Sequence, residues 1–300
     1  MPKIAYHPAY VHAVREGHRF PMAKYAQLYM QILESAAYSQ ATFFEPQLAD
    51  SELLCLAHDK AYVQQLLDLT LDERMVRRIG FPLTQELIER ELYLVDGTVQ
   101  ASMYALEDGL AFNIAGGTHH SGYNYGEGFC LLNDQAVAAA NLLHKKLARR
   151  ILIIDLDVHQ GNGTAHIFSG SETVFTFSMH AEKNYPFVKE ASFLDVPLVD
   201  ALSDADYLAL LEEQLNYLFS FVQPDFVFYQ AGVDVLATDK LGKLALTAQA
   251  CAARDALVFN YCRQAAVPIQ VSMGGGYSAD IQVIVDAHLA TIRLGLEIIS

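Results

Sequence analysis

Short runs of apolar residues alternate with longer amphipathic segments along most of the 300-residue chain. The short runs are typical of strands buried on both faces of a parallel sheet, and the longer segments repeat their apolar positions with the period of an α-helix. This alternation predicts an α/β fold with a central, mostly parallel β-sheet that helices cover on both faces. The predicted strands are 111–115, 151–154, 174–177, 226–229 and 268–272, and the predicted helices are 22–38, 59–69, 84–107, 134–148, 203–222, 247–266 and 280–299.

No internal repeat or linker divides the pattern, so a single domain is expected across residues 1–300. The first twenty residues are rich in His and Tyr, with His7, Tyr10, His12 and His18. They are predicted to form a loop or rim rather than a metal site, because no second cluster of regular spacing accompanies them.

Polar or glycine-rich residues follow each of the five predicted strands directly. In open α/β sheets ligands bind at this edge, since every strand there opens into a loop. The active site is therefore expected at the C-terminal ends of the strands. The residues delivered there include His119, His120, Asp155, Asp157, His159, Ser178, Asp234, Asp239 and Tyr277.

The run 151–154 leads into the most informative of these segments, Asp155-Leu-Asp157-Val-His159. Side chains two residues apart in an extended chain point the same way, so these three share one side. A carboxylate and an imidazole placed in this way can grip one metal ion, and Gly161-Asn162-Gly163 allows the backbone to turn tightly around it. An isolated Asp-x-His is more often the polar end of a strand, but the other polar strand ends favour the metal site.

Composition excludes some functions and leaves others open. The net charge of −15 argues against a nucleic-acid-binding surface and is compatible with either ordinary solubility or cationic substrates. The four cysteines form no Cys-x-x-Cys pair and are expected to be reduced core thiols. No signal sequence or membrane span is apparent, so a cytoplasmic protein is expected.

The polar residues fit metal-assisted hydrolysis of an amide. A catalytic zinc site needs three protein ligands and an open position, and Asp157, His159 and either Asp234 or Asp239 meet that requirement. Ferrous iron or cobalt would accept the same ligands. His119 and His120 are candidate proton carriers, and Tyr277, after three glycines, is a candidate donor to the developing oxyanion. No serine or cysteine has the context of a nucleophile, and no phosphate-binding loop is present.

Five motifs in order resemble the zinc-dependent histone deacetylase family of the arginase/deacetylase superfamily. They are His119-His120, Gly126-Glu-Gly-Phe-Cys130, Asp155-Leu-Asp-Val-His-Gln-Gly-Asn162, Gly232-Val-Asp with Asp239, and Gly274-Gly-Gly-Tyr277. The residues of these motifs are most similar to those of class IV members and bacterial histone deacetylase-like amidohydrolases. The resemblance implies that the chain removes acetyl or longer acyl groups from lysine-like amines.

The resemblance also implies roles for single residues. Zinc would be held by Asp157, His159 and Asp239, and His120 would be the general base and then the acid. His119 would act as an electrostatic or acid partner oriented by Asp155, and Tyr277 would hydrogen-bond the substrate carbonyl. Gly128 would accept from the substrate amide, and Phe129 and Tyr185 would wall a narrow tunnel. Structural potassium would be bound by Asp155, the backbone oxygens of Asp157, His159 and Met179, and Ser178, with a second ion near Phe168, Ser171 and Val174.

Asn162 departs from the aspartate that part of the family carries at this position. A carboxylate would raise the pKa of its histidine partner, whereas a neutral amide would not. The hypothesis is that His120 stays neutral nearer to pH 7, so that Asn162→Asp would shift the acidic limb of the pH–rate profile upward.

Three other interpretations remain. A two-manganese ureohydrolase of the arginase type would need an Asp where Gly161 stands. A small-molecule deacylase, such as an acetylpolyamine amidohydrolase, would share every catalytic residue and act on an acylated small amine rather than on an acyl-lysine peptide. A non-catalytic protein that binds acyl-lysine would have no need of Tyr277 and both histidines.

Overall fold

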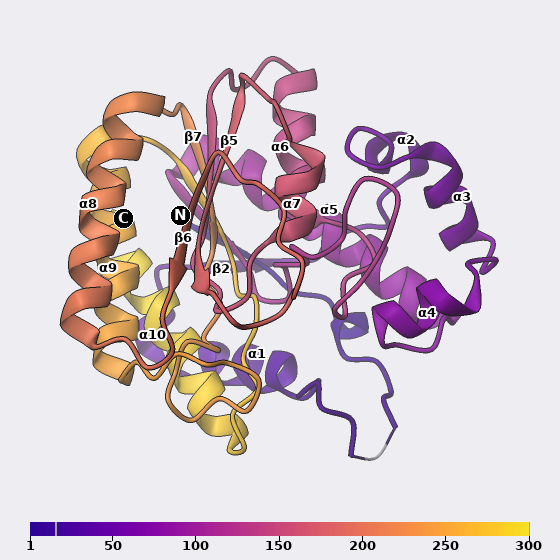
Figure 1. Ribbon diagram of the computed structural model, residues 1–300, viewed down its shortest axis with the longest axis horizontal. Helices are drawn as coiled ribbons and strands as arrows, with labels where there is room; N and C mark the ends of the chain where they lie inside the picture. Colours follow the sequence, from indigo (N-terminus) through magenta and orange to yellow (C-terminus); the bar gives the residue numbers. More distant parts are fainter. Residues whose placement is uncertain (16, 300) are drawn as a thin grey trace.

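The strands of the chain pair in one sheet, and every pairing is parallel. The computed structural model describes residues 1–15 and 17–299. Over these residues the sheet has eight strands in the order β2-β1-β3-β8-β7-β4-β5-β6 (Figure 1), so the predicted fold class is confirmed. The strands are β1 (Lys3–Ala5), β2 (Thr42–Phe44), β3 (Leu110–Asn113), β4 (Ile151–Asp155), β5 (Val174–Ala181), β6 (Leu194–Leu198), β7 (Phe226–Gln230) and β8 (Ile269–Ser272).

Helices cover both faces of this sheet. Figure 1 shows α8, α9 and α10 on one side of the strands and α5 and α6 on the other, and α1 packs against α10. The helices are α1 (Lys24–Glu34), α2 (Ser51–Leu54), α3 (Lys60–Leu67), α4 (Glu73–Ile79), α5 (Gln85–Asp108), α6 (Asp134–His144), α7 (Asn162–Ile167), α8 (Asp204–Val222), α9 (Ala248–Ala265) and α10 (Ile281–Ile299), with short 3-10 turns at Pro8–Tyr10 and Ala36–Tyr38. No helix among the described residues is both long and apolar enough to cross a membrane.

Helices α5, α8 and α9 begin where the sequence provides a side-chain cap. The Oγ atoms of Thr84, Ser203 and Thr247 accept hydrogen bonds from backbone N–H groups in the first turns of α5, α8 and α9. Helix α5 ends at Gly109, whose φ of 81° is the left-handed conformation that glycine adopts without strain. Local capping chemistry therefore explains why these boundaries were predictable.

Shorter elements differ from the predictions. The prediction that residues 1–20 form a loop is wrong for Lys3–Ala5, because β1 lies inside the sheet between β2 and β3. Three residues are too few to show a period of two, which also explains why β2 was not predicted. The predicted helix 134–148 ends at His144, and the predicted strand 174–177 continues to Ala181.

The five strands predicted from the sequence are neighbours in the order β3-β8-β7-β4-β5. Strand β4 lies between β7 and β5, and all five of its residues are buried. Because the strands are parallel, the loops after their C-terminal ends meet at one edge of the sheet. The candidate active site lies at this edge.

Candidate active site

The segment after β4 is held in one conformation by its own side chains. Asp155 Oδ1 accepts a hydrogen bond from the backbone N of Asp157 at 3.1 Å. Asp157 Oδ1 accepts from the backbone N of His159 at 3.0 Å. All three side chains are buried. Strand β4 ends at Asp155, so the predicted extended chain does not continue to His159. Hydrogen bonds from backbone N–H groups to the side chains of Asp155 and Asp157 hold this segment instead.

Asp157, His159 and Asp234 form a group that fits a metal ion. Their ligand atoms all lie within 4.8 Å of one another, and all three residues are buried. His159 Nδ1 is 3.1 Å from both Asp157 Oδ1 and Asp234 Oδ2. Burial and the neighbouring charge of Asp157 raise the pKa of Asp234 to about 7. Two carboxylates and an imidazole this close suit a divalent cation, whose charge would offset their repulsion.

Asp239 lies beside this group but is not part of it. Its Oδ1 accepts from the backbone N of Leu241 and of Gly242, both at 2.8 Å, and its Oδ2 accepts from the backbone N of Tyr277 at 2.6 Å. Leu241 and Tyr277 both line the cavity next to this group, and Asp239 is only partly buried, whereas Asp234 is fully buried. The sequence left these two carboxylates as alternatives, and the structure brings both to the same strand edge.

The backbone turns tightly at Gly161, as predicted. Its φ of −72° and ψ of 63°, with the 2.8 Å hydrogen bond from Asn162 N to Gln160 O, form an inverse γ-turn directly before α7. This φ is open to any residue, so glycine is needed here for close approach. A Cβ at Gly161 would lie 2.1 Å from Asp155 Oδ2, and one at Gly163 would lie 2.3 Å from the backbone oxygen of Ser121. Side chains at these positions would push the end of β4 away from the histidine loop.

His119 and His120 differ in their partners. His119 Nδ1 donates to Asp155 Oδ2 at 2.7 Å, and although burial opposes it, the carboxylates of Asp155 and Asp157 raise the pKa of His119 to about 9. His120 Nδ1 donates to Asn162 Oδ1 at 2.7 Å. Burial, followed by the charges of His119 and His159, lowers the pKa of His120 well below its ordinary value. The surroundings of the two imidazoles therefore shift their pKa values in opposite directions.

Glu127 is a site residue that the sequence did not single out, although it stands inside the Gly126–Cys130 motif. Its Oε1 accepts a hydrogen bond from Asn162 Nδ2, and its Oε2 accepts from Arg78 Nε. The carboxylate is buried behind the amide that contacts His120. The contacts with Asn162 and Arg78, both distant in sequence, give Glu127 a place in the site, so local sequence carried no signal for it.

Tyr277 lies across from the imidazoles. Its ring centroid is 6.5 Å from that of His159 and 6.3 Å from that of Phe129. Burial, followed by the charges of Asp234 and Asp157, raises the pKa of its phenol well above the ordinary value, so the hydroxyl stays protonated and able to donate. The glycines before it adopt φ angles of +65° at Gly274 and +159° at Gly276, and Lys24 Nζ donates to the oxygen of Gly274 at 3.0 Å.

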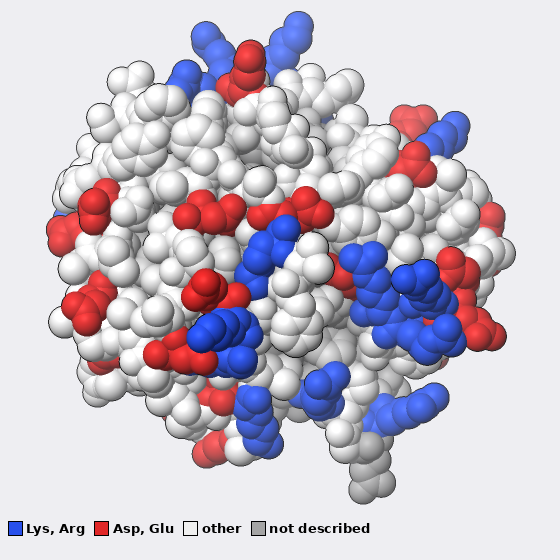
Figure 2. Space-filling view, viewed as in Figure 1, with Lys and Arg blue, Asp and Glu red and all other residues white. Residues whose placement is uncertain are grey.

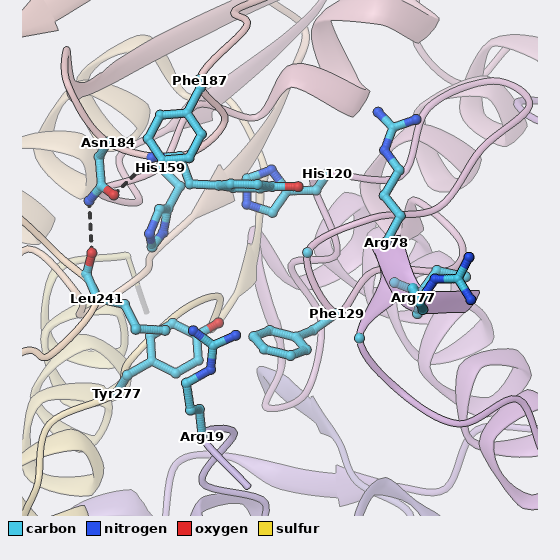
Figure 3. A pocket seen from close by; sticks show the side chains of 14 residues that line it. Arg19, Arg77, Arg78, His120, Phe129, His159, Asn184, Phe187, Leu241 and Tyr277 are labelled. Atoms are coloured by element: carbon cyan, nitrogen blue, oxygen red, sulfur yellow. Dashed lines mark hydrogen bonds between the residues drawn. The ribbon is translucent and has the colours of Figure 1, made fainter. Parts of the chain in front are cut away.

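A cavity of about 350 Å³ leads from the surface to these groups. Figure 3 shows His120, His159, Tyr277 and Phe129 around it, and the two imidazoles are buried, so they mark its inner end. The predicted tunnel residues Gly128, Phe129 and Tyr185 all line it. The complete lining is Arg19, Arg77, Arg78, Ile79, Gly80, His120, Gly128, Phe129, His159, Asn184, Tyr185, Phe187, Leu241 and Tyr277.

The residues implied for potassium fall into two places. Ser178 pairs in register with Asp155 between β5 and β4, so Ser178 and Met179 lie beside the segment that begins with Asp155. The other three lie at the opposite end of β5, where Ser171 N donates to Phe168 O at 3.0 Å and Ser171 Oγ accepts from Val174 N at 2.9 Å. The structure thus brings each predicted set together as a local group.

Comparisons with known proteins identify the family of the chain. A model of the histone deacetylase domain matches residues 18–292. An uncharacterized protein of Picosynechococcus sp. is 46% identical over 285 residues, which cover 95% of each chain. Histone deacetylase 2 of Arabidopsis thaliana is 30% identical over 293 residues, covering 94% of this chain and 76% of the relative. Histone deacetylase RPD3 of Saccharomyces cerevisiae is 28% identical, covering 91% of this chain and 64% of the relative. The chain therefore belongs to the histone deacetylase family.

Proposed function

We propose that the protein is a metal-dependent amidohydrolase that removes acetyl or longer acyl groups from lysine-like amines. The observation that carries the proposal is the inner end of the cavity, where His120, His159 and Tyr277 converge beside a buried carboxylate pair. Family membership supports deacetylase activity in general, and the choice of zinc and of substrate belongs to this proposal.

Asp157 and His159 would hold the metal together with one carboxylate of the loop after β7. Asp239 is our choice for the third ligand, because its partners Leu241 and Tyr277 face the cavity from which a substrate would arrive. Asp234, which accepts from the backbone N of Val158 at 3.0 Å, would then help to fix the metal-binding segment. When bound, zinc, or ferrous iron or cobalt in its place, would polarise the scissile carbonyl and lower the pKa of a bound water.

His120 would act as the general base. Because its Nδ1 donates to Asn162, its Nε2 carries the free lone pair, and the lowered pKa keeps that nitrogen unprotonated. His120 would take a proton from the attacking water and return it to the leaving amine. His119, whose Nδ1 donates to Asp155, would when protonated stabilise the negative charge that develops on the reacting carbonyl.

Tyr277 and the cavity walls would position the substrate. The protonated phenol of Tyr277 would donate to the carbonyl oxygen as it gains negative charge. Phe129 and Tyr185 would enclose the aliphatic part of the acyl-lysine side chain, and the Gly128 carbonyl would accept from its amide N–H. Exclusion of water by these rings would strengthen the electrostatic interactions at the inner end.

Potassium would stabilise the protein rather than take part in the reaction. The proposed first ion would bind between Asp155 and Ser178, and the second at the turn near Ser171. Replacement of potassium by the larger cation caesium would lower the thermal stability at constant ionic strength, and an unchanged Tm would contradict the proposed sites.

The experiment that tests this function is hydrolysis of a panel of acyl-lysine peptides and acetylpolyamines by protein loaded with a defined metal. Cleavage of peptides would establish a lysine deacylase and show which acyl length it prefers. Cleavage of polyamines alone would favour the small-molecule deacylase. Binding of acetyl-lysine peptides without turnover on zinc, iron or cobalt would favour the non-catalytic interpretation.

A further inference from the structure

The mouth of the cavity is basic, although the whole chain carries a net charge of −15. Arg19, Arg77 and Arg78 line it, whereas no Asp or Glu of the described residues does so. Figure 2 shows basic side chains gathered over α4, the helix that carries Arg77 and Arg78. In Figure 3 these two arginines lie on one side of the cavity and Phe187 on the other. We call Arg19, Arg77 and Arg78 the basic rim.

The charge of the basic rim is only partly balanced by the residues that the structure describes. Arg78 donates to the buried Glu127 and stacks over the ring of Tyr125, with 4.4 Å between guanidinium and centroid. Arg77 pairs with Glu73 at 3.1 Å, but both side chains are strongly exposed, so the pair is weak. Arg19 is exposed and makes no ion pair with residues 1–15 or 17–299. Arg19 and Arg77 therefore remain available to a ligand.

The position of the rim decides which part of a substrate it would meet. The acyl group would reach the inner end, beside His120 and Tyr277, so the rim would face the residues that flank the modified lysine. The opposite edge is apolar, because Phe187 is 85% exposed and Val188 is 82% exposed. Guanidinium groups bind carboxylates through paired hydrogen bonds.

We propose that the basic rim selects acyl-lysine peptides that carry Asp or Glu beside the modified lysine. This inference rests on the proposed function and names its substrate class. Charges across an interface set specificity and encounter rate more than total affinity, so flanking Lys or Arg residues and the free amines of polyamines would be disfavoured. The acidic composition of the chain as a whole is thus a poor guide to its substrate.

The test compares three acetyl-lysine peptides of equal length whose flanking residues are acidic, neutral or basic. The wild-type protein should cleave the acidic peptide with a kcat/KM at least about tenfold above that of the basic one. Arg19→Ala/Arg77→Ala should reduce this ratio by about three- to tenfold, and high salt should reduce it likewise. Arg149→Ala is the matched control, because Arg149 is exposed just before β4, at the sheet edge opposite the site.

Equal cleavage of all three peptides, or a preference for the basic one, would overturn the basic rim as a specificity element while leaving the proposed function intact. If no peptide is cleaved, the proposed function fails instead. Fluorescence anisotropy with the same peptides, labelled, then tests the role of the basic rim in binding alone. Tighter binding of the acidic peptide that depends on Arg19 and Arg77 would support this role, and equal binding of all three peptides would overturn it.

The second inference concerns Glu127. An ionised carboxylate only accepts hydrogen bonds, so the partner that Asn162 presents to Glu127 must be its Nδ2 group. Asn162 Oδ1 is then directed to His120, whose Nδ1 must donate. The structure assigns Glu127 as a positioning residue, which fixes the orientation of the Asn162 amide and through it the tautomer of His120 required for a base.

The assignment is tested by the effect of Glu127→Gln on kcat, which should have opposite signs in two backgrounds. In the wild-type background Glu127→Gln permits the Asn162 amide to rotate and should lower kcat by about tenfold with little change in KM. Asn162→Asp alone places two carboxylates in contact and should be strongly impaired. In that background Glu127→Gln provides an amide donor to the new carboxylate and should raise kcat again. A residue that only anchors Arg78 would make Glu127→Gln harmful, or neutral, in both backgrounds, and that result would overturn the assignment.

Discussion

The two ends of the cavity differ in burial and in charge and are built from different elements. Behind the imidazoles of the inner end lie the carboxylates of Asp157, Asp234 and Asp239, which accept backbone hydrogen bonds from the loops after β4 and β8. The basic rim places exposed guanidinium groups on α4 and on the segment before α1. The inner end therefore holds its side chains rigidly, as catalysis requires. The exposed arginines at the outer end can instead favour some substrates over others.

The largest effects should come from the inner end. His120→Ala removes the proposed base and should lower kcat by about 10²- to 10⁴-fold. His119→Ala removes only a nearby positive charge and should have a smaller effect on kcat. Steady-state kinetics of both variants, with circular dichroism as a check on folding, measures the difference. Equal losses would contradict the separate roles assigned to the two imidazoles.

Zinc affinity distinguishes the two carboxylates that could provide the third metal ligand. Asp239→Asn should weaken zinc binding more than a hundredfold if Asp239 is a ligand, whereas Asp234→Asn, which alters a supporting contact, should weaken it by about ten- to a hundredfold. Competition with a chromogenic chelator gives the affinities without any need for activity. The reverse order would make Asp234 the third ligand.

The packing of the inner end can be disturbed without changing its charges. Gly161→Ala would force a Cβ to within 2.1 Å of Asp155 Oδ2, and should lower both kcat and the free energy of unfolding, the latter by about 1–3 kcal/mol. Gly170→Ala is the matched control, because nothing lies within 4 Å of the point that its Cβ would occupy and only its φ of +72° opposes alanine. Denaturant unfolding should show a cost for both variants, but only Gly161→Ala should lose activity. Full activity in Gly161→Ala would contradict the close packing.

The smallest expected change is a shift in pH dependence. The pKa of His120 is lowered, so the base stays neutral and activity persists as the pH falls towards that lowered value. A carboxylate at position 162 would favour the charged imidazole and raise this pKa. The acidic limb of kcat/KM should therefore move upward by about one pH unit in Asn162→Asp/Glu127→Gln, where repulsion from Glu127 is absent. An unmoved limb would contradict the role of the neutral amide.

The sequence predicted the features that depend on local pattern. Thr84, Gly109, Ser203 and Thr247 mark helix ends through their own side-chain or backbone chemistry, and five buried strands showed continuous apolar runs. Parallel topology then implied that His120, His159 and Tyr277 would meet at one edge. These inferences needed no knowledge of long-range contacts.

Contacts between distant segments account for what was missed. Strand β1 is recognisable only because β2 and β3 pair with its three residues. Glu127 gains its importance from Asn162, and the basic rim combines Arg19 with two arginines of α4. Net charge is a sum over the whole surface, so it could not reveal a local reversal of sign at the mouth of the cavity.

Metal-dependent amide hydrolysis is tested by turnover of one acetyl-lysine peptide by four preparations: protein as purified, protein stripped with a chelator, stripped protein reloaded with zinc, and zinc-loaded Tyr277→Phe. Stripping should abolish acetate release, zinc should restore it, and Tyr277→Phe should lower kcat by at least about 10²-fold while retaining zinc. Turnover that survives both the loss of metal and the loss of the phenol hydroxyl would contradict metal-dependent hydrolysis.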